Sequence, residues 1–216
     1  MSAIALPSMM SGLFPGEAKE RDTAASSSPR PHDATAGDEE LMRRYRSGDA
    51  DAFVHLYRRH GDRLHRFVRR MVSDWAEVDE VFQEIWIAVI RGKDRYVSGS
   101  GFTTWLFTIA HHRAVERRRA RSPFARVDSV DPNEVELVDD GNPDPGDFMH
   151  RVDVSQALLD AIAQLPWLQR EAFLLRAEEE MSIEQIALVT GVGHDTAKSR
   201  LRYAYTRLRK SLETWR

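Results

Sequence analysis

The chain has 216 residues, a formal net charge of −3 and no cysteine. Its length suits one ordinary domain or two small ones, and without thiols it can form neither a disulfide nor a thiolate metal site. No apolar run is long enough to span a bilayer, and the N-terminus lacks the positive and apolar regions of a signal peptide. We therefore expect a cytoplasmic protein without membrane insertion.

Charge is distributed unevenly along the chain. Acidic residues exceed Lys and Arg by four over residues 1–40 and by seven over residues 122–153, whereas Lys and Arg are in excess by seven over residues 41–121. Residues 194–216 alone carry an excess of five positive charges. Two basic surfaces that flank an acidic strip favour a polyanionic partner, although solvated helix faces carry charge in most soluble proteins.

Residues 1–37 are rich in Ser, Ala, Pro and Gly without periodicity, which predicts a disordered tail. Residues 38–121 instead show apolar residues at three- and four-residue intervals, the spacing of helices, and no convincing strand. Two long apolar stripes consist of Phe53, Leu56, Tyr57, Leu64, Phe67, Val68 and Met71, and of Val78, Val81, Phe82, Ile85, Trp86 and Val89. A Gly- and Ser-rich loop, KDRYVSGSG, then precedes a helix with an apolar start and a cationic end.

Residues 122–153 are acidic and punctuated by proline, which is typical of an extended linker between domains. Residues 154–216 are helical again, with Pro166 expected in the first turn of a helix and Ser182 expected as an N-cap. The sequence therefore predicts an all-α protein, with two small helical domains joined by an acidic flexible linker.

A short helix starting near Ser182, a GVG turn and a longer cationic helix have the spacing of a helix-turn-helix. The longer helix carries six cations and no carboxylate from Lys198 to Lys210. Its inward stripe is Ala197, Leu201, Ala204, Leu208 and Leu212, and its outward stripe is Asp195, Lys198, Ser199, Arg202, Thr206 and Arg209. Such a face can neutralise phosphates or donate to guanine edges, although the helix dipole also favours cations near a C-terminus.

The segment LPWLQREAFLLRAEEEMSIEQIALVTGVGHDTAKSRLRYAYTRLRKSL resembles the C-terminal DNA-binding region of bacterial sigma factors. Upstream, DEVFQEIW resembles the D-x-x-Q-E helix of the same family, and FTTWLFTIAHHRAVERRR resembles its F-x-x-W-L-x-x-I-A-x-N helix. Both halves stand in order, with a bare linker between them. This layout is similar to the extracytoplasmic-function (ECF) branch of the sigma-70 family.

The resemblance implies that residues 38–121 are sigma region 2, which binds core RNA polymerase and melts the −10 promoter element. Residues 154–216 are then region 4, which reads the −35 element in duplex DNA. For docking on the coiled coil of the largest polymerase subunit, the resemblance implies Asp79, Gln83 and Glu84. For −10 DNA it implies Tyr96, Phe102, His111, His112, Arg113, Arg117 and Arg118, and for −35 DNA it implies Thr196, Lys198, Ser199, Arg200, Arg202 and Tyr203.

Within region 2, residues 94–104 correspond to the loop that captures a flipped base. His112 occupies the usual Asn position of the family motif, which leaves the −10 sequence preference open. The resemblance also implies contact with the polymerase flap, an anti-sigma partner, and an acidic linker threaded through the polymerase channel.

We expect no metal, cofactor or enzymatic activity. His111 and His112 are helix neighbours that point about 100° apart and so make poor joint ligands, and no P-loop, GxSxG motif or dinucleotide turn is present. Two other interpretations stay open: a stand-alone helix-turn-helix regulator that binds an operator as a dimer, and an adaptor that binds only protein partners.

Overall fold

The computed structural model describes residues 36–99, 101–121 and 154–213. The linker predicted over residues 122–153 and nearly all of the predicted N-terminal tail lie outside these ranges. Every regular element in the described ranges is a helix, which confirms the predicted fold class.

Four helices form the first half of the described chain, which we call the N-terminal bundle. They are α1 (Asp38–Arg46), α2 (Ala50–Met71), α3 (Trp75–Gly92) and α4 (Phe102–Arg121), with a 3₁₀ turn, η3 (Lys93–Arg95), between the last two. Carboxylates cap two of these helices, because Asp49 accepts hydrogen bonds at the start of α2 and Asp74 accepts one at the start of α3. Because η3 takes up the first three residues of the predicted Gly- and Ser-rich loop, that loop begins one turn later than the sequence suggested.

The core of the N-terminal bundle is aromatic. The α3 stripe is buried as predicted, and so is the α2 stripe apart from Tyr57, which is half-buried. Phe67 of α2 and Phe107 of α4 meet edge to face, with their ring centroids 5.2 Å apart, an arrangement that aromatic quadrupoles favour. This contact fixes α4 against α2, so the residues on the opposite side of α4 face the rest of the molecule.

Replacing Phe107 with Ala should lower the free energy of unfolding by about 3–5 kcal/mol, because its ring is fully buried and would leave a cavity. Urea unfolding followed by circular dichroism measures the change. Val97→Ala is the control, since that side chain is 77% exposed and should change stability by less than about 0.5 kcal/mol. A loss below about 1 kcal/mol for Phe107→Ala would contradict this core.

The second half, which we call the C-terminal bundle, consists of α5 (Val154–Ala163), α6 (Trp167–Ala177), α7 (Ile183–Thr190) and α8 (His194–Leu212). Pro166 lies one position earlier than predicted, at the N-cap of α6 instead of in its first turn. Its carbonyl accepts hydrogen bonds from the backbone of Gln169 and Arg170. Because the N–H of an N-cap residue takes no part in the helical hydrogen bonds, the missing N–H of proline does not weaken α6.

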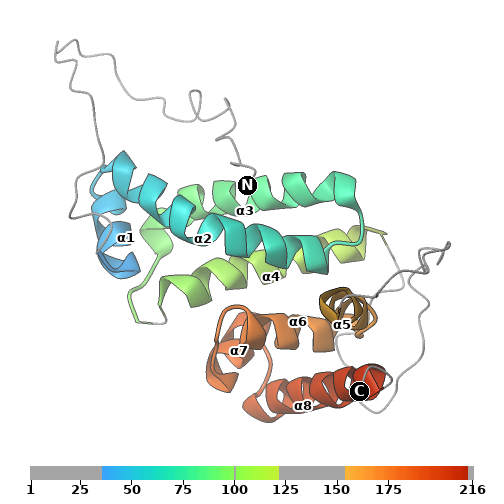
Figure 1. Cartoon of the computed structure of the whole chain (residues 1–216). Coiled ribbons are helices and arrows are strands. Elements are labelled where there is room, and N and C mark those ends of the chain that lie inside the picture. The colour runs from blue at the N-terminus through green and yellow to red at the C-terminus, as the bar shows by residue number, and fades with distance from the viewer. Residues whose placement is uncertain (1–35, 100, 122–153, 214–216) are drawn as a thin grey trace, which may run out of the picture.

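The two bundles pack against each other. Figure 1 shows α4 between the other helices of its own bundle and the C-terminal bundle, with α8 on the far side of the latter. Helix α4 contacts α7, and α2 contacts α6. The buried apolar residues of both bundles join one cluster, from Leu41 to Leu208. The arrangement therefore exposes α8 while it covers one side of α4.

Candidate nucleic-acid interface

Helices α7 and α8 form the predicted helix-turn-helix. Ser182 caps α7 as expected and forms a capping box with Gln185, in which each side chain bonds the other residue's backbone N–H. Gly191 ends the helix in the left-handed conformation, with φ at 66°, which a side chain rarely adopts. The turn therefore comes from local sequence, and α8, which it leads into, also packs against α5 and α6.

Helix α8 has one buried and one exposed face. Ala197, Leu201, Ala204 and Leu208 of the predicted inward stripe are buried, and Leu212 packs against the core from its edge. Of the residues predicted to contact −35 DNA, Lys198 and Arg202 are exposed, whereas Thr196, Ser199, Arg200 and Tyr203 are partly buried. The Arg202 guanidinium lies 5.0 Å from the ring centroid of Tyr203, which holds this cation near the middle of the exposed face.

The turn also borders a feature that the sequence pattern did not reveal. A hollow of about 530 Å³ is lined by Glu184, Ala187, Leu188, Gly191, Val192 and His194. Leu188 is largely exposed there, and His194 lies between the carboxylates of Glu184 and Asp195. An exposed leucine of this kind can contact another protein or, if the helix-turn-helix binds DNA as predicted, a thymine methyl group.

The three residues predicted to dock on polymerase lie along the outer side of α3. Asp79 is 82% exposed on its side chain and contacts only the imidazole of His65, at 3.1 Å, among the described residues. Gln83 is exposed, and Glu84 is partly exposed. This face presents carboxylates to solvent, as a basic partner requires.

Arg117, predicted to bind −10 DNA, is held by the same acidic helix. Its guanidinium lies 3.0 Å from Glu80, 3.4 Å from Glu84 and 3.7 Å from Glu77. The hydrogen bond with Glu80 is the main cause that raises the pKa of Arg117, which keeps the group charged. For Arg117 to bind a phosphate, the phosphate must replace these carboxylates as its partner.

The loop predicted to capture a flipped base keeps its aromatic rings inside the bundle. Tyr96 is 3% exposed and Phe102 is 1% exposed, and their ring centroids lie 6.3 Å apart in an edge-to-face contact. Arg46 donates a hydrogen bond to the Tyr96 carbonyl at 3.3 Å. The loop backbone and the exposed Val97 are therefore accessible to a base, whereas the two buried rings pack beneath the loop and hold its position.

A hollow of about 240 Å³ lies beside this loop and was not foreseen from the sequence. Its lining consists of Glu39, Glu40, Arg43, Arg46, Tyr96 and Ser98. Helix α1 therefore contributes to the region, although its short amphipathic pattern gave no functional signal. The connection shows in contacts between distant residues, such as the hydrogen bond of Arg46 with the loop fifty residues away and the ammonium of Lys93 over the ring of Tyr45.

The cationic residues of α4 fall into two groups. His111 is buried, and its Nδ1 lies 2.7 Å from Glu171 Oε1 of α6. Arg118 stacks at 5.3 Å from the ring centroid of Trp167, also of α6. His111 is thus covered by the C-terminal bundle and Arg118 is in contact with it, whereas His112 is exposed; Arg113 and Arg118 are both partly exposed.

His112 stands where the resembling family usually has Asn, and its charge state bears on the base recognition predicted for it. Partial loss of water around the ring, and then the neighbouring imidazole of His111, lower the pKa of His112. The ring is therefore neutral near neutral pH, with one donor and one acceptor nitrogen. An Asn side chain also offers both functions, so the replacement preserves hydrogen-bonding capacity.

Where the two bundles meet, α6 ends in carboxylates that face the cations of α2. Glu178 forms an ion pair with Arg70, and Glu179 is buried near Arg63, His60 and Arg66. Burial raises the pKa of Glu179, and these three neighbours oppose that effect. For the pKa of Glu179, the loss of hydrating water therefore has a larger effect than the attraction of the nearby positive charges.

Glu179→Gln should make the protein more stable at about pH 7.5 and leave it unchanged at about pH 4. A carboxyl whose pKa is raised by folding stabilises the fold below its unfolded pKa, and that contribution is lost as the pH rises. Gln imitates the neutral form at every pH. Thermal unfolding at the two pH values tests this, with the exposed neighbour Glu180→Gln as control. A lower Tm for Glu179→Gln at about pH 7.5 would show that the cations dominate instead.

The described residues offer neither a membrane span nor a metal site. No helix there combines the length and apolar character needed to cross a bilayer. No group of three or more His, Asp or Glu side chains within those residues is arranged to hold a metal ion.

Comparison with known proteins extends these observations. A family model of sigma-70 region 2 matches residues 56–123, and a model of sigma-70 region 4 matches residues 155–208. The RNA polymerase sigma factor CarQ of Myxococcus xanthus is 33% identical over 180 residues, which cover 79% of this chain and 95% of CarQ. The ECF RNA polymerase sigma factor SigK of Mycobacterium sp. (strain KMS) is 31% identical over 169 residues, covering 75% of this chain and 83% of SigK.

Solved structures share the fold. CnrH, solved in complex with the cytosolic domain of CnrY, superposes with a TM-score of 0.58 at 23% identity, covering 82% of this chain and 97% of that one. The sigma factor RpoE of Bartonella quintana, solved with the anti-sigma factor NepR, gives a TM-score of 0.57 at 24% identity, covering 76% and 98%. The arrangement of helices is therefore one that known proteins adopt.

Proposed function

The chain belongs to the ECF subfamily of sigma-70 RNA polymerase sigma factors, and from this premise we propose which part of promoter recognition each bundle performs. It is an alternative sigma factor that directs promoter-specific transcription. We assign residues 38–121 to core binding and −10 recognition, and residues 154–216 to −35 recognition. The observation that carries this division is the pair of family matches, one in each bundle.

For polymerase docking, the proposal uses Asp79, Gln83 and Glu84 of α3. Their support is the exposed acidic face of this helix, which suits the coiled coil of the largest subunit if that element is basic. The C-terminal bundle would contact the flap, and its exposed Leu158, Leu159 and Leu188 are the candidates for that contact.

For the −10 element, the proposal uses the loop over residues 94–104 and the cations of α4. His112 is exposed, and among the described residues Arg113 pairs only with Glu116 one turn along the same helix, so both can reach a displaced strand without movement of another helix. His111, Arg117 and Arg118 become available only after their present partners move away. Tyr96 and Phe102 keep their place in the proposal as supports of the loop.

For the −35 element, the proposal places α8 in the major groove. Lys198 and Arg202 would contact base edges or phosphates from its exposed face, with Thr196, Ser199, Arg200 and Tyr203 beside them. The sharp turn at Gly191 supports this assignment, because it lets α7 brace α8 from behind.

Regulation and location belong to the same proposal. An anti-sigma factor is expected to bind this chain, since RpoE, whose fold is similar, was solved with the anti-sigma factor NepR, and CnrH was solved with the cytosolic domain of CnrY. We place the protein in the cytoplasm, where core polymerase is found, and we assign it no catalytic step of its own. The predicted passage of the acidic linker through the polymerase channel stays a prediction.

A binding experiment separates this function from that of an operator-binding regulator. The purified chain is run on size-exclusion chromatography alone, with duplex DNA and with core polymerase. A sigma factor elutes as a monomer, binds duplex weakly and shifts fully into the core fraction. A dimer that binds duplex tightly and leaves core unshifted would establish the regulator instead.

A further inference from the structure

The corner where α2 turns into α3 carries an exposed tryptophan that none of the predicted sites uses. Trp75, at the start of α3, is 69% exposed and is the largest exposed apolar side chain among the described residues. The guanidinium of Arg69, near the end of α2, lies 5.0 Å from the centroid of its ring. Because a cation stacked on an indole is attracted to it even in water, Arg69 holds the ring in one orientation while most of it stays open to solvent.

The same two helices make a second contact of this kind one turn further along. Nε2 of His65 lies 3.1 Å from Oδ1 of Asp79. His65 comes four residues before Arg69 on α2, and Asp79 comes four residues after Trp75 on α3. Residues four apart share one face of a helix and lie about 6 Å apart along its axis. The two contacts therefore follow each other between antiparallel helices, and we call these four residues the outer row.

Within the outer row, His65 fixes a carboxylate that would otherwise move freely. The side chain of Asp79 is 82% exposed, whereas that of His65 is only 24% exposed. The imidazole of His65 also meets the ring of Phe82 edge to face, with the centroids 5.3 Å apart. The imidazole is thus held by packing, and it holds one oxygen of Asp79 while the other oxygen stays available. A group already held in place loses less entropy when a partner binds it.

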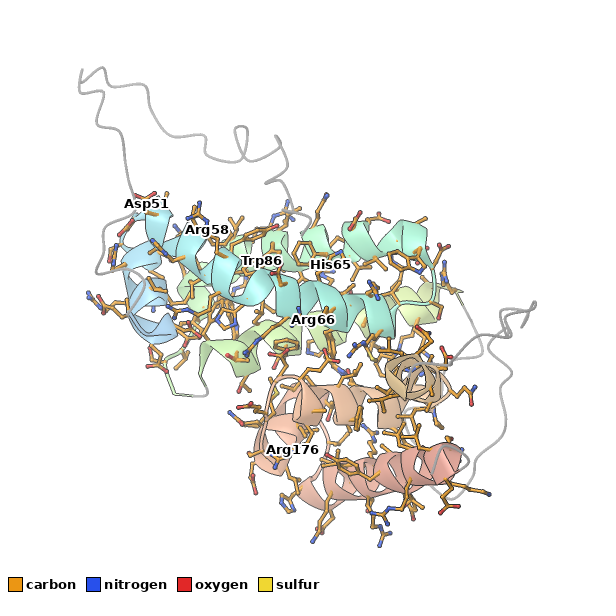
Figure 2. All side chains as sticks on the ribbon, in the orientation of Figure 1. Asp51, Arg58, His65, Arg66, Trp86 and Arg176 are labelled. Carbon is orange, nitrogen blue, oxygen red and sulfur yellow. The ribbon has the colours of Figure 1, made fainter. Side chains whose placement is uncertain are left out.

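The outer row is continuous with the face that we propose for polymerase docking. Trp75, Asp79 and Gln83 are all exposed and follow one another at intervals of four residues along α3. Figure 2 shows His65 on the side of α2 that faces α3, whereas Arg66 lies between α2 and the C-terminal bundle. The row is therefore accessible on the side of the N-terminal bundle that the C-terminal bundle does not cover.

The chemistry of this surface fits a protein helix better than a nucleic acid. Trp and Arg are the residues most enriched at the energetic centres of protein interfaces. The exposed carboxylates of Asp79 and Glu80 lie on the same side of α3, and they would repel a phosphate backbone. A partner helix that presents a cation to Asp79 and an apolar side chain to Trp75, one turn apart, matches both positions.

Resting on the proposed function, we propose that the polymerase-docking face extends from α3 onto α2, with Trp75 as its apolar anchor and His65 as the residue that positions Asp79. Arg69 holds the indole of Trp75 in its binding orientation. The partner is the same basic helical element of core polymerase that Asp79, Gln83 and Glu84 are proposed to meet. Exposed charges contribute mostly to the rate and specificity of association, so the tryptophan supplies affinity that the carboxylates alone do not.

The test measures the affinity of full-length variants for core polymerase. Each protein carries a fluorophore on its N-terminal amine and is titrated with core polymerase, so that fluorescence anisotropy gives its Kd. Circular dichroism and thermal unfolding check that each variant is folded.

Trp75→Ala should raise the Kd about thirtyfold, as loss of an interface hot spot does, and Trp75→Phe should raise it less. Arg69→Ala should raise the Kd about fivefold, because the indole loses the cation that orients it. The matched controls are Tyr205→Ala, which removes an exposed aromatic ring of α8, and Arg66→Ala, which removes an exposed arginine on the other side of α2. Both controls should stay within about twofold of the parent.

For His65, a double-mutant cycle separates positioning from packing. His65→Ala should raise the Kd about fivefold, and His65→Gln, whose amide can still donate to Asp79, should restore it. In the presence of Asp79→Ala, His65→Ala should have no further effect, because a residue that acts through Asp79 then has nothing to position. Additive losses in the double variant would overturn the positioning role.

A Kd of Trp75→Ala equal to that of the parent would overturn the extended docking face, while binding of the parent to core polymerase would leave the proposed function standing. Failure of the parent itself to bind core polymerase would overturn both. A parallel titration with oligothymidylate of about 20 nucleotides tests the other occupant. If Trp75→Ala weakens binding to this strand and leaves the Kd for core polymerase unchanged, the tryptophan binds single-stranded DNA and the proposal is wrong.

Discussion

Changing Asp79 and Glu84 together to Arg is expected to abolish co-elution with core polymerase and, with it, promoter-specific transcription. Both carboxylates lie on the exposed side of α3, and neither contributes to the core of the bundle. Reversing two charges against a basic partner replaces attraction with like-charge contact, which costs several kcal/mol. A loss of about 4 kcal/mol alone weakens binding roughly a thousandfold. Size-exclusion chromatography with core polymerase measures the loss directly.

The matched control for this variant carries the same charge change elsewhere. Asp51 and Asp62 are both exposed on α2, so their joint change to Arg alters net charge equally without touching α3. This control should still elute with core polymerase, and both proteins should keep their helical circular dichroism. Full co-elution of the Asp79 and Glu84 variant would contradict the assignment of α3 as the docking helix.

Replacing Arg202 or Lys198 with Ala is expected to weaken −35 recognition by about 1–3 kcal/mol and to relax the sequence preference there. Both side chains are exposed on α8, on the face opposite its buried stripe. A side chain that contacts a base edge affects some promoter sequences more than others, whereas a phosphate contact affects all alike. Transcription from promoters with single base changes in the −35 element distinguishes the two.

Lys210→Ala provides the comparison on the same helix. It lies twelve residues beyond Lys198, or about 18 Å along the axis, and it is also exposed. We expect it to leave sequence preference unchanged. If Arg202→Ala and Lys198→Ala both transcribe every promoter as the parent does, the exposed face of α8 does not read DNA.

The features predictable from sequence are those fixed by neighbouring residues. The α3 stripe, the buried side of α8 and the Ser182 cap all follow from helical periodicity or from a capping pattern a few residues long. The family resemblance then placed the candidate sites on these helices. The position of Pro166 differed by one residue, a usual uncertainty at helix ends.

The features that the sequence did not predict depend on contacts between distant residues. Tyr96 and Phe102 were expected near a base, but packing against Trp105 and His60 turns their rings into the bundle. Arg117 was expected to face DNA, but glutamates more than thirty residues earlier hold it. His111 and Glu171 are sixty residues apart in sequence, and no local pattern shows that they meet.

The central claim is that this chain gives promoter specificity to RNA polymerase, and run-off transcription tests it most directly. Purified protein is added to bacterial core polymerase with a pool of genomic promoter fragments, with core polymerase alone as the reference. The account predicts discrete new transcripts whose upstream regions share −10 and −35 sequences. Transcripts identical to those of core alone, together with tight binding of the chain to duplex DNA, would contradict it.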